Sequence, residues 1–94
     1  MADMTFEQRL QDQLDTDPEF AASENGRRVA RVLGLPPRRR ERVLIRMEDH
    51  ARAHIQFTGR DWGSVKKVDW QNLLKLFETL LPIILQLLKL FAVI

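Results

Sequence analysis

Residues 70–94 read WQNLLKLFETLLPIILQLLKLFAVI, and this C-terminal stretch decides how the rest of the chain is organised. From residue 73 onward Pro82 interrupts an aliphatic and aromatic run whose polar members are Lys75, Glu78, Thr79, Gln86 and Lys89. As an α-helix, residues 73–94 would be about 33 Å long, close to the roughly 30 Å hydrocarbon core of a bilayer. The stretch predicts one long hydrophobic helix at the C-terminus, a candidate transmembrane or interfacial anchor.

The polar residues of this segment recur every three or four positions, so a helix places them on one narrow stripe. Three environments fit that pattern. The helix can cross a bilayer with the stripe against a partner, or lie in the membrane interface with the stripe toward water. It can also lie in a soluble bundle, with the leucine side in the core and the stripe wet. We favour the spanning interpretation, because proline is accepted more readily in membrane helices than in soluble ones.

The spanning interpretation gives each side of the helix a role. Another helix is expected to meet the stripe, because an unpaired amide in lipid is costly. The predicted contact residues are Thr79, Pro82 and Gln86, and the predicted membrane-anchor residues are Leu73, Leu76, Phe77, Leu80, Ile84, Leu87 and Phe91. Indole rings favour the headgroup layer and lysine stems reach toward it, which predicts an interface belt of Trp62, Trp70, Lys75 and Lys89.

The rest of the chain shows helix signals and no alternating strand pattern, so we predict an all-α protein. We divide it into a small helical N-terminal region over residues 1–59, a connector over 60–69 and the hydrophobic helix over 70–94. Three short helices are expected in the first region. Thr5 and Gln8 form a capping box for the first helix, and Asp17 followed by Pro18 starts the second.

The second and third helices have less certain boundaries in the sequence. Gly34 is a natural end for the second, but Gly26 lies inside it, so a bend with a restart at Ser23 is the alternative. The third helix starts at the Pro36-Pro37 pair and has apolar residues at helical spacing up to the vicinity of Gly59. Asp69 is expected to cap the last helix.

Charge is distributed unevenly along the chain. Residues 1–35 carry seven acidic and four basic residues, whereas residues 36–67 carry nine basic and four acidic ones. The predicted basic surface consists of Arg38, Arg39, Arg40, Arg42 and Arg46. By the positive-inside rule this block and the N-terminal region stay cytoplasmic, and basic residues beside a membrane attract anionic lipid.

Residues 33–46 offer a nucleic-acid alternative. Leu35-Pro36-Pro37-Arg38 resembles the start of DNA-binding region 4 of bacterial sigma factors, which implies contact with DNA. The glycine-containing turn and recognition helix that the resemblance requires are replaced by Met47-Glu48-Asp49-His50 and a continuing helix. Aromatic residues for base stacking are also sparse here, so nucleic-acid binding is the less favoured interpretation.

Nothing in the sequence predicts catalysis. The chain has no cysteine, and Ser23 and Ser64 are its only serines. His50 and His54 have the i, i+4 spacing of a metal pair, but no third ligand is evident. We therefore expect no enzymatic activity, no metal site, no cofactor and no small-molecule substrate.

These observations predict a small membrane-anchored structural or accessory subunit of a larger assembly, either a protein complex or a virion. It would dock on other protein subunits through its N-terminal helices and bind membrane lipid through its C-terminal helix. The alternatives are a soluble helical oligomer with a shared core of C-terminal helices, and a basic nucleic-acid-binding protein.

Overall fold

The computed structural model describes residues 4–56 and 61–92, with side chains up to Ile83 and at Gln86. In these ranges every regular element is helical, which confirms the predicted all-α class. The elements are α1 (Phe6–Thr16), α2 (Pro18–Ala22), α3 (Glu24–Leu33), α4 (Pro37–His54), the 3-10 turn η1 (Trp62–Ser64) and α5 (Lys67–Ala92).

The first three helices begin where short polar side chains cap free backbone N–H groups. The hydroxyl of Thr5 accepts from the N–H of Gln8 at 3.1 Å, and the Gln8 side chain accepts from the N–H of Thr5 at 2.9 Å, so the predicted capping box is confirmed. Asp17 accepts from the N–H of Phe20 at 3.1 Å and starts α2.

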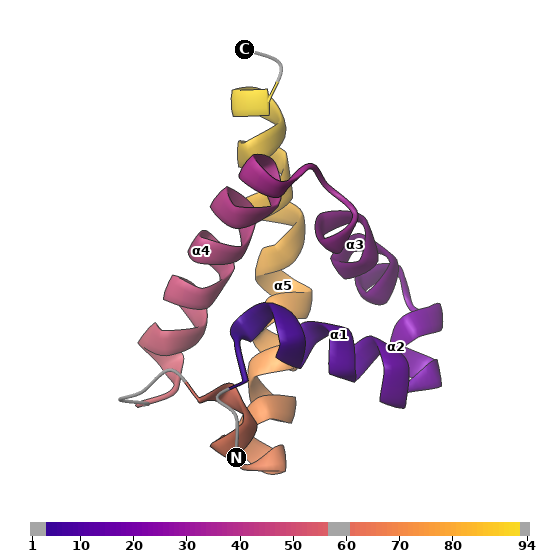
Figure 1. Ribbon diagram of the computed structural model, residues 1–94, viewed down its shortest axis with the longest axis vertical. Coiled ribbons are helices and arrows are strands. Elements are labelled where there is room, and N and C mark those ends of the chain that lie inside the picture. Colours follow the sequence, from indigo (N-terminus) through magenta and orange to yellow (C-terminus); the bar gives the residue numbers. More distant parts are fainter. Residues whose placement is uncertain (1–3, 57–60, 93–94) are drawn as a thin grey trace.

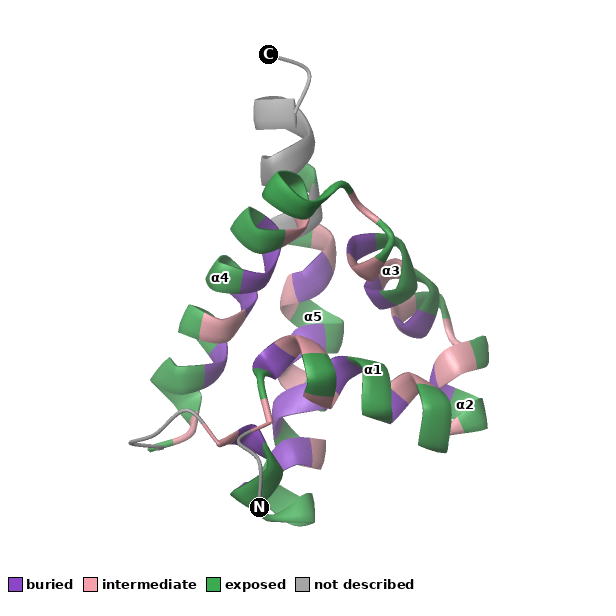
Figure 2. Cartoon of the chain, in the orientation of Figure 1, coloured by how far each residue is buried: buried purple, intermediate pink, exposed green. Residues whose placement is uncertain are grey.

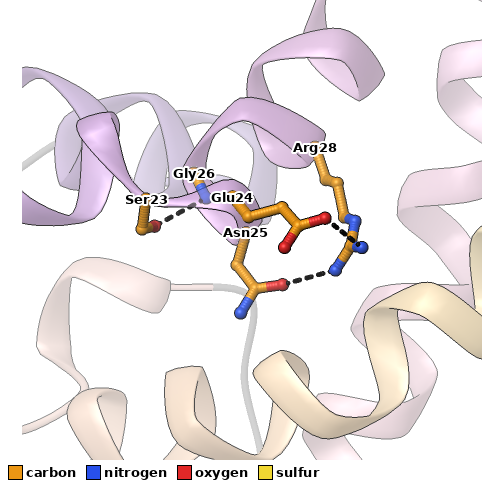
Figure 3. Close-up of polar contacts among 5 residues, drawn as sticks. All are labelled: Ser23, Glu24, Asn25, Gly26 and Arg28. Atoms are coloured by element: carbon orange, nitrogen blue, oxygen red, sulfur yellow. Dashed lines mark hydrogen bonds and ion pairs between the residues drawn. The ribbon is translucent and has the colours of Figure 1, made fainter.

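The predicted second helix is two helices, divided at Ser23. The Ser23 hydroxyl accepts from the N–H of Gly26 at 3.0 Å (Figure 3), and its extended backbone turns the chain between α2 and α3. On the next turn, the guanidinium of Arg28 donates to Asn25 at 2.9 Å and to Glu24 at 2.8 Å. The bend with a restart at Ser23, which the sequence left as an alternative, is the observed arrangement.

The last two helices differ from the expected boundaries at one end each. Helix α4 ends at His54, with Ile55 in an extended conformation, whereas the predicted stop at Gly59 lies outside the described residues. Helix α5 begins at Lys67, which places Asp69 in its first turn rather than at its cap. An acidic residue there still faces the positive end of the helix dipole.

Helices α4 and α5 run in opposite directions beside each other, and α3 contacts α5 on another side (Figure 1). Helices α1 and α2 pack against α3, with α2 farthest from α5. The segment that leads into α5 lies beside the N-terminal part of the chain: the backbone N–H of Trp62 donates to the carbonyl of Met4 at 3.0 Å. The molecule is longest along α5, at 39 Å.

All of these elements contribute to one hydrophobic core. Helix α4 faces this core with buried apolar residues, and its exposed side, seen in Figure 2, is mainly charged. The buried apolar residues are Phe6, Leu10, Phe20, Val29, Val32, Val43, Leu44, Met47, Ala51, Trp62, Val65, Trp70, Leu73, Leu74, Phe77 and Leu81.

Phe6 lies at the centre of the aromatic part of this core. Its ring centroid is 5.0 Å from that of Trp62, 6.2 Å from Trp70 and 5.7 Å from Phe77. The rings meet at steep angles, the geometry that aromatic pairs prefer to face-to-face stacking. One side chain of α1 thus joins η1 to the first half of α5.

Gly26 is required where α3 passes close to α2. A Cβ atom on Gly26 would overlap the carbonyl oxygen of Phe20 and lie 2.7 Å from its carbonyl carbon. The obstacle is backbone, which a rotamer change does not relieve. Gly34 has no such restriction, because its nearest neighbour, the carbonyl oxygen of Ala30, would be 3.5 Å from an added Cβ.

We predict that Gly26→Ala destabilises the protein by about 2 kcal/mol or more, because the overlap outweighs the gain in helix propensity of about 1 kcal/mol. Gly34→Ala is the matched control and should change the free energy of unfolding by less than about 1 kcal/mol. Urea denaturation followed by circular dichroism measures both. Equal stabilities for the two variants would show that α2 and α3 are not packed as described.

Candidate functional site

Helix α5 has two parts with different surroundings. It is 26 residues long and its neighbour α4 is 18, a difference of about 12 Å at 1.5 Å per residue. Since the two helices run in opposite directions, the last turns of α5 extend past the beginning of α4 (Figure 1). We define residues 83–94 as the apolar end.

The first part of α5 is inside the protein core. Leu73 and Phe77, predicted to face lipid, are buried, while Leu76 and Leu80 are half-buried and Leu80 packs against the core. Their apolar side is occupied by other helices of the chain. The remaining predicted anchor side chains, Ile84, Leu87 and Phe91, lie outside the described residues.

No helix in residues 4–56 and 61–92 has both the length and the apolarity to cross a membrane. The predicted transmembrane anchor is therefore unsupported. Its physical weakness is that about half of the segment is needed for the core described above, and a side chain packed there is not available to acyl chains.

The two tryptophans of the predicted interface belt are core residues. Trp62 and Trp70 are each only 1% exposed. Each indole N–H has a partner inside the protein: Trp70 donates to the side-chain oxygen of Gln13 at 2.9 Å, and Trp62 donates to Glu48 at 3.4 Å. The structure thus gives these tryptophans a packing role instead of a headgroup role. Of the two lysines in the belt, Lys75 is exposed and the side chain of Lys89 is outside the described residues.

The predicted helix-contact stripe lies mostly in solvent. Thr79 and Gln86 are exposed and Pro82 is half-buried, so no neighbouring helix of this chain covers the two polar residues. The leucine side of α5 faces the other helices and its polar stripe faces solvent, which is the arrangement expected of an amphipathic helix that packs on a protein core.

Ile83 is a large apolar residue on the solvent-facing side of α5. It lies one turn after Thr79 and one turn before Gln86 and is 54% exposed, whereas Leu81, on the opposite side of the helix, is 0% exposed. The residues that follow it are apolar except for Gln86 and Lys89. The sequence of the apolar end is therefore as hydrophobic as that of the buried half.

Four arginines form an exposed basic face on α4. Arg38, Arg42 and Arg46 follow one another at single-turn spacing and Arg39 lies beside them, opposite the side on which Val43 and Met47 are buried. We call Arg38, Arg39, Arg42 and Arg46 the arginine face. Arg40, the fifth residue of the predicted basic surface, points elsewhere: it is half-buried and forms an ion pair with Glu7 of α1 at 2.9 Å.

The arginine face and the apolar end lie at the same end of the molecule. The face begins in the first turn of α4, and that turn lies beside the later turns of α5 (Figure 1). The exposed acidic residues Asp12, Asp15, Glu19 and Glu24 belong to α1, α2 and the start of α3. Helices α1 and α2 lie toward the other end of the long axis. The arginine face and the apolar end thus lie together, away from the exposed acidic residues of α1 and α2.

A buried polar connection was not anticipated from the sequence. Gln13 is only 7% exposed, accepts from Trp70 and donates to Asp17 at 2.9 Å, and Asp17 in turn caps α2. Gln13 is seven residues after Phe6, so the helical spacing that placed Phe6 and Leu10 on one face also includes it.

No group of three histidine or acidic side chains in the described ranges could hold a metal ion. His50 and His54 are both exposed. Comparison with known protein families, with curated proteins and with solved structures gives no match for this chain.

We predict that Gln13→Met destabilises the protein by about 1–3 kcal/mol, because the buried N–H of Trp70 loses its acceptor. The cost should be smaller in a Trp70→Phe background, which has no N–H to satisfy, and a double-mutant cycle in urea measures the difference. Gln11→Met is the control: Gln11 bonds Asp15 on the exposed side of the same helix and should contribute only tenths of a kcal/mol. Additive effects of Gln13→Met and Trp70→Phe would contradict the contact.

We also predict that tryptophan fluorescence is blue-shifted and protected from acrylamide in the absence of any membrane, because both indoles are buried in the core. The chain has no tryptophan besides these two, so the spectrum reports both directly. Addition of lipid vesicles should change neither the emission maximum nor the quenching constant. If acrylamide quenched the tryptophans strongly in buffer and vesicles prevented that quenching, the two indoles would instead lie in the membrane interface, as the predicted belt requires.

Proposed function

We propose that the protein is a small non-enzymatic accessory subunit that attaches to a membrane surface through the apolar end of α5 and presents its other helices to a larger assembly. The observation that carries this proposal is the extension of α5 past the beginning of α4 (Figure 1). Ile83, on the solvent-facing side of the helix, is 54% exposed, and the sequence that follows it is apolar except for Gln86 and Lys89. Exposed apolar surface concentrated at one place marks a site of protein or membrane interaction.

Insertion into one membrane leaflet suits the apolar end better than crossing. From Ile83 to its end at Ala92, α5 is about 15 Å long, short of the roughly 30 Å of a hydrocarbon core. The residues that would complete a span, among them Leu73 and Phe77, support the core of the protein. A helix that enters the interface needs only its apolar residues in the acyl boundary.

A second candidate is a helical oligomer in which apolar ends from several copies bury one another. The exposure of Thr79 and Gln86 favours this candidate, since a solvent-exposed polar stripe is compatible with a water-soluble helical bundle. Nucleic-acid binding is less favoured. The aromatic residues with described side chains are all buried, so none of them is free to stack on a base.

The test is flotation of the full-length protein with phospholipid vesicles on a density gradient. We predict that the wild-type protein floats and that Ile83→Glu and Leu87→Glu each reduce binding by tenfold or more, because burial of one large aliphatic side chain contributes about 2 kcal/mol. Thr79→Glu is the matched control. It adds the same charge one turn before Ile83, at an exposed position of the same helix, and should float like the wild type.

Each variant is checked for its circular dichroism spectrum and thermal midpoint, so that unfolding is not mistaken for lost attachment. Wild-type protein that stays at the bottom of the gradient would refute the membrane proposal. Concentration-dependent sedimentation that Ile83→Glu abolishes would then identify the oligomer.

A further inference from the structure

The arginine face of α4 has no role in holding the fold together. Arg28, Arg40 and Arg52 form ion pairs with Glu24, Glu7 and Glu48, at 2.8, 2.9 and 2.8 Å. By contrast, the side chains of the arginine face make no hydrogen bond or ion pair with any residue in the described part of the chain. Four unpaired guanidinium groups on one exposed helix side repel one another, which is a small cost to the isolated protein.

The chemistry of this surface suits phosphate groups. A guanidinium is planar, stays charged at any physiological pH and offers paired N–H donors that match two oxygens of a phosphate. From Arg38 to Arg46 the face extends about 12 Å along the helix axis. It therefore presents several phosphate-binding groups in a row instead of a single enclosed site.

The position of the arginine face in the molecule indicates that the phosphates it binds are those of lipid headgroups. The face begins where α5 extends past α4, so an apolar end inserted in acyl chains brings the beginning of α4 to the level of the headgroups. The acidic residues of α1 and α2 are carried away from the bilayer in the same orientation. The arginine face is then attracted to anionic lipid, while the acidic residues of α1 and α2 stay apart from it.

We propose that the arginine face binds the headgroups of anionic phospholipids and thereby makes membrane attachment selective for negatively charged bilayers. This inference rests on the proposed function, since it is the apolar end that brings the face to the membrane. Neutral lipid offers the apolar end the same hydrocarbon. The arginine face accordingly decides which membrane is chosen and how the protein is oriented on it.

The experiment compares binding of the full-length protein to vesicles of phosphatidylcholine alone and to vesicles that also contain phosphatidylserine. The wild type should prefer the anionic vesicles. Arg38→Gln combined with Arg42→Gln should weaken binding to them by about fivefold for each arginine removed, and leave binding to neutral vesicles unchanged. Both residues are exposed and unpaired, so the fold should be retained.

The matched control is Lys66→Gln combined with Lys67→Gln. It removes the same net charge from two exposed residues at the opposite end of the molecule, where α5 begins. If the arginine face acts by its location, this variant should keep the wild-type preference for anionic vesicles. A loss equal to that of the arginine variant would show that only overall charge matters and would overturn the inference.

The remaining outcomes separate the inference from the function beneath it. Equal binding of the wild type to neutral and anionic vesicles would overturn the inference and support the membrane attachment. Binding to neither would overturn both. Salt-dependent binding to duplex DNA or RNA that the arginine variant abolishes, without a preference for anionic vesicles, would assign the face to nucleic acid.

Discussion

The structure depends on the insertion of Phe6 among Trp62, Trp70 and Phe77. These contacts hold the first helix of the chain against its last, with η1 between them. They are reinforced at the edges, because Trp70 donates to Gln13 and the guanidinium of Arg9 lies 5.0 Å above its ring. Without this cluster the first half of α5 would lose its contact with α1, since the aromatic partner of Trp70 and Phe77 in α1 is Phe6.

The packing of this core determines which parts of α4 and α5 remain available for binding. Leu81 is the last described core residue of α5, and α4 is too short to run beside the helix to its end. One continuous helix therefore has a first half packed in the core and a last part that extends past α4. The same antiparallel pairing brings the start of α4, with its unpaired arginines, to that end. Apolar and basic surface are thus adjacent through topology, although some forty residues separate them in sequence.

Several of these features are readable from residues alone. The caps at Thr5 and Asp17, the restart at Ser23, the proline start of α4 and the helical spacing of the apolar residues follow from local stereochemistry and period. Local rules suffice there because each signal acts within one turn of helix. The concentration of arginine before the hydrophobic segment is equally a property of the sequence, but which arginine pairs with a distant acid is not. Arg40 turns to Glu7 while its neighbours remain exposed.

The sequence by itself determined that the protein is all-helical, that its last helix is hydrophobic and that a basic segment precedes that helix. Only the tertiary structure decided that Trp70, Leu73 and Phe77 face a protein core and that Gly26 must lack a side chain against Phe20. The physical reason is that burial of apolar surface is non-directional: the same side chains are stabilised by acyl chains or by other helices, and period alone does not distinguish the two. The choice is made by contacts between residues far apart in the chain, above all those of Phe6 with α5.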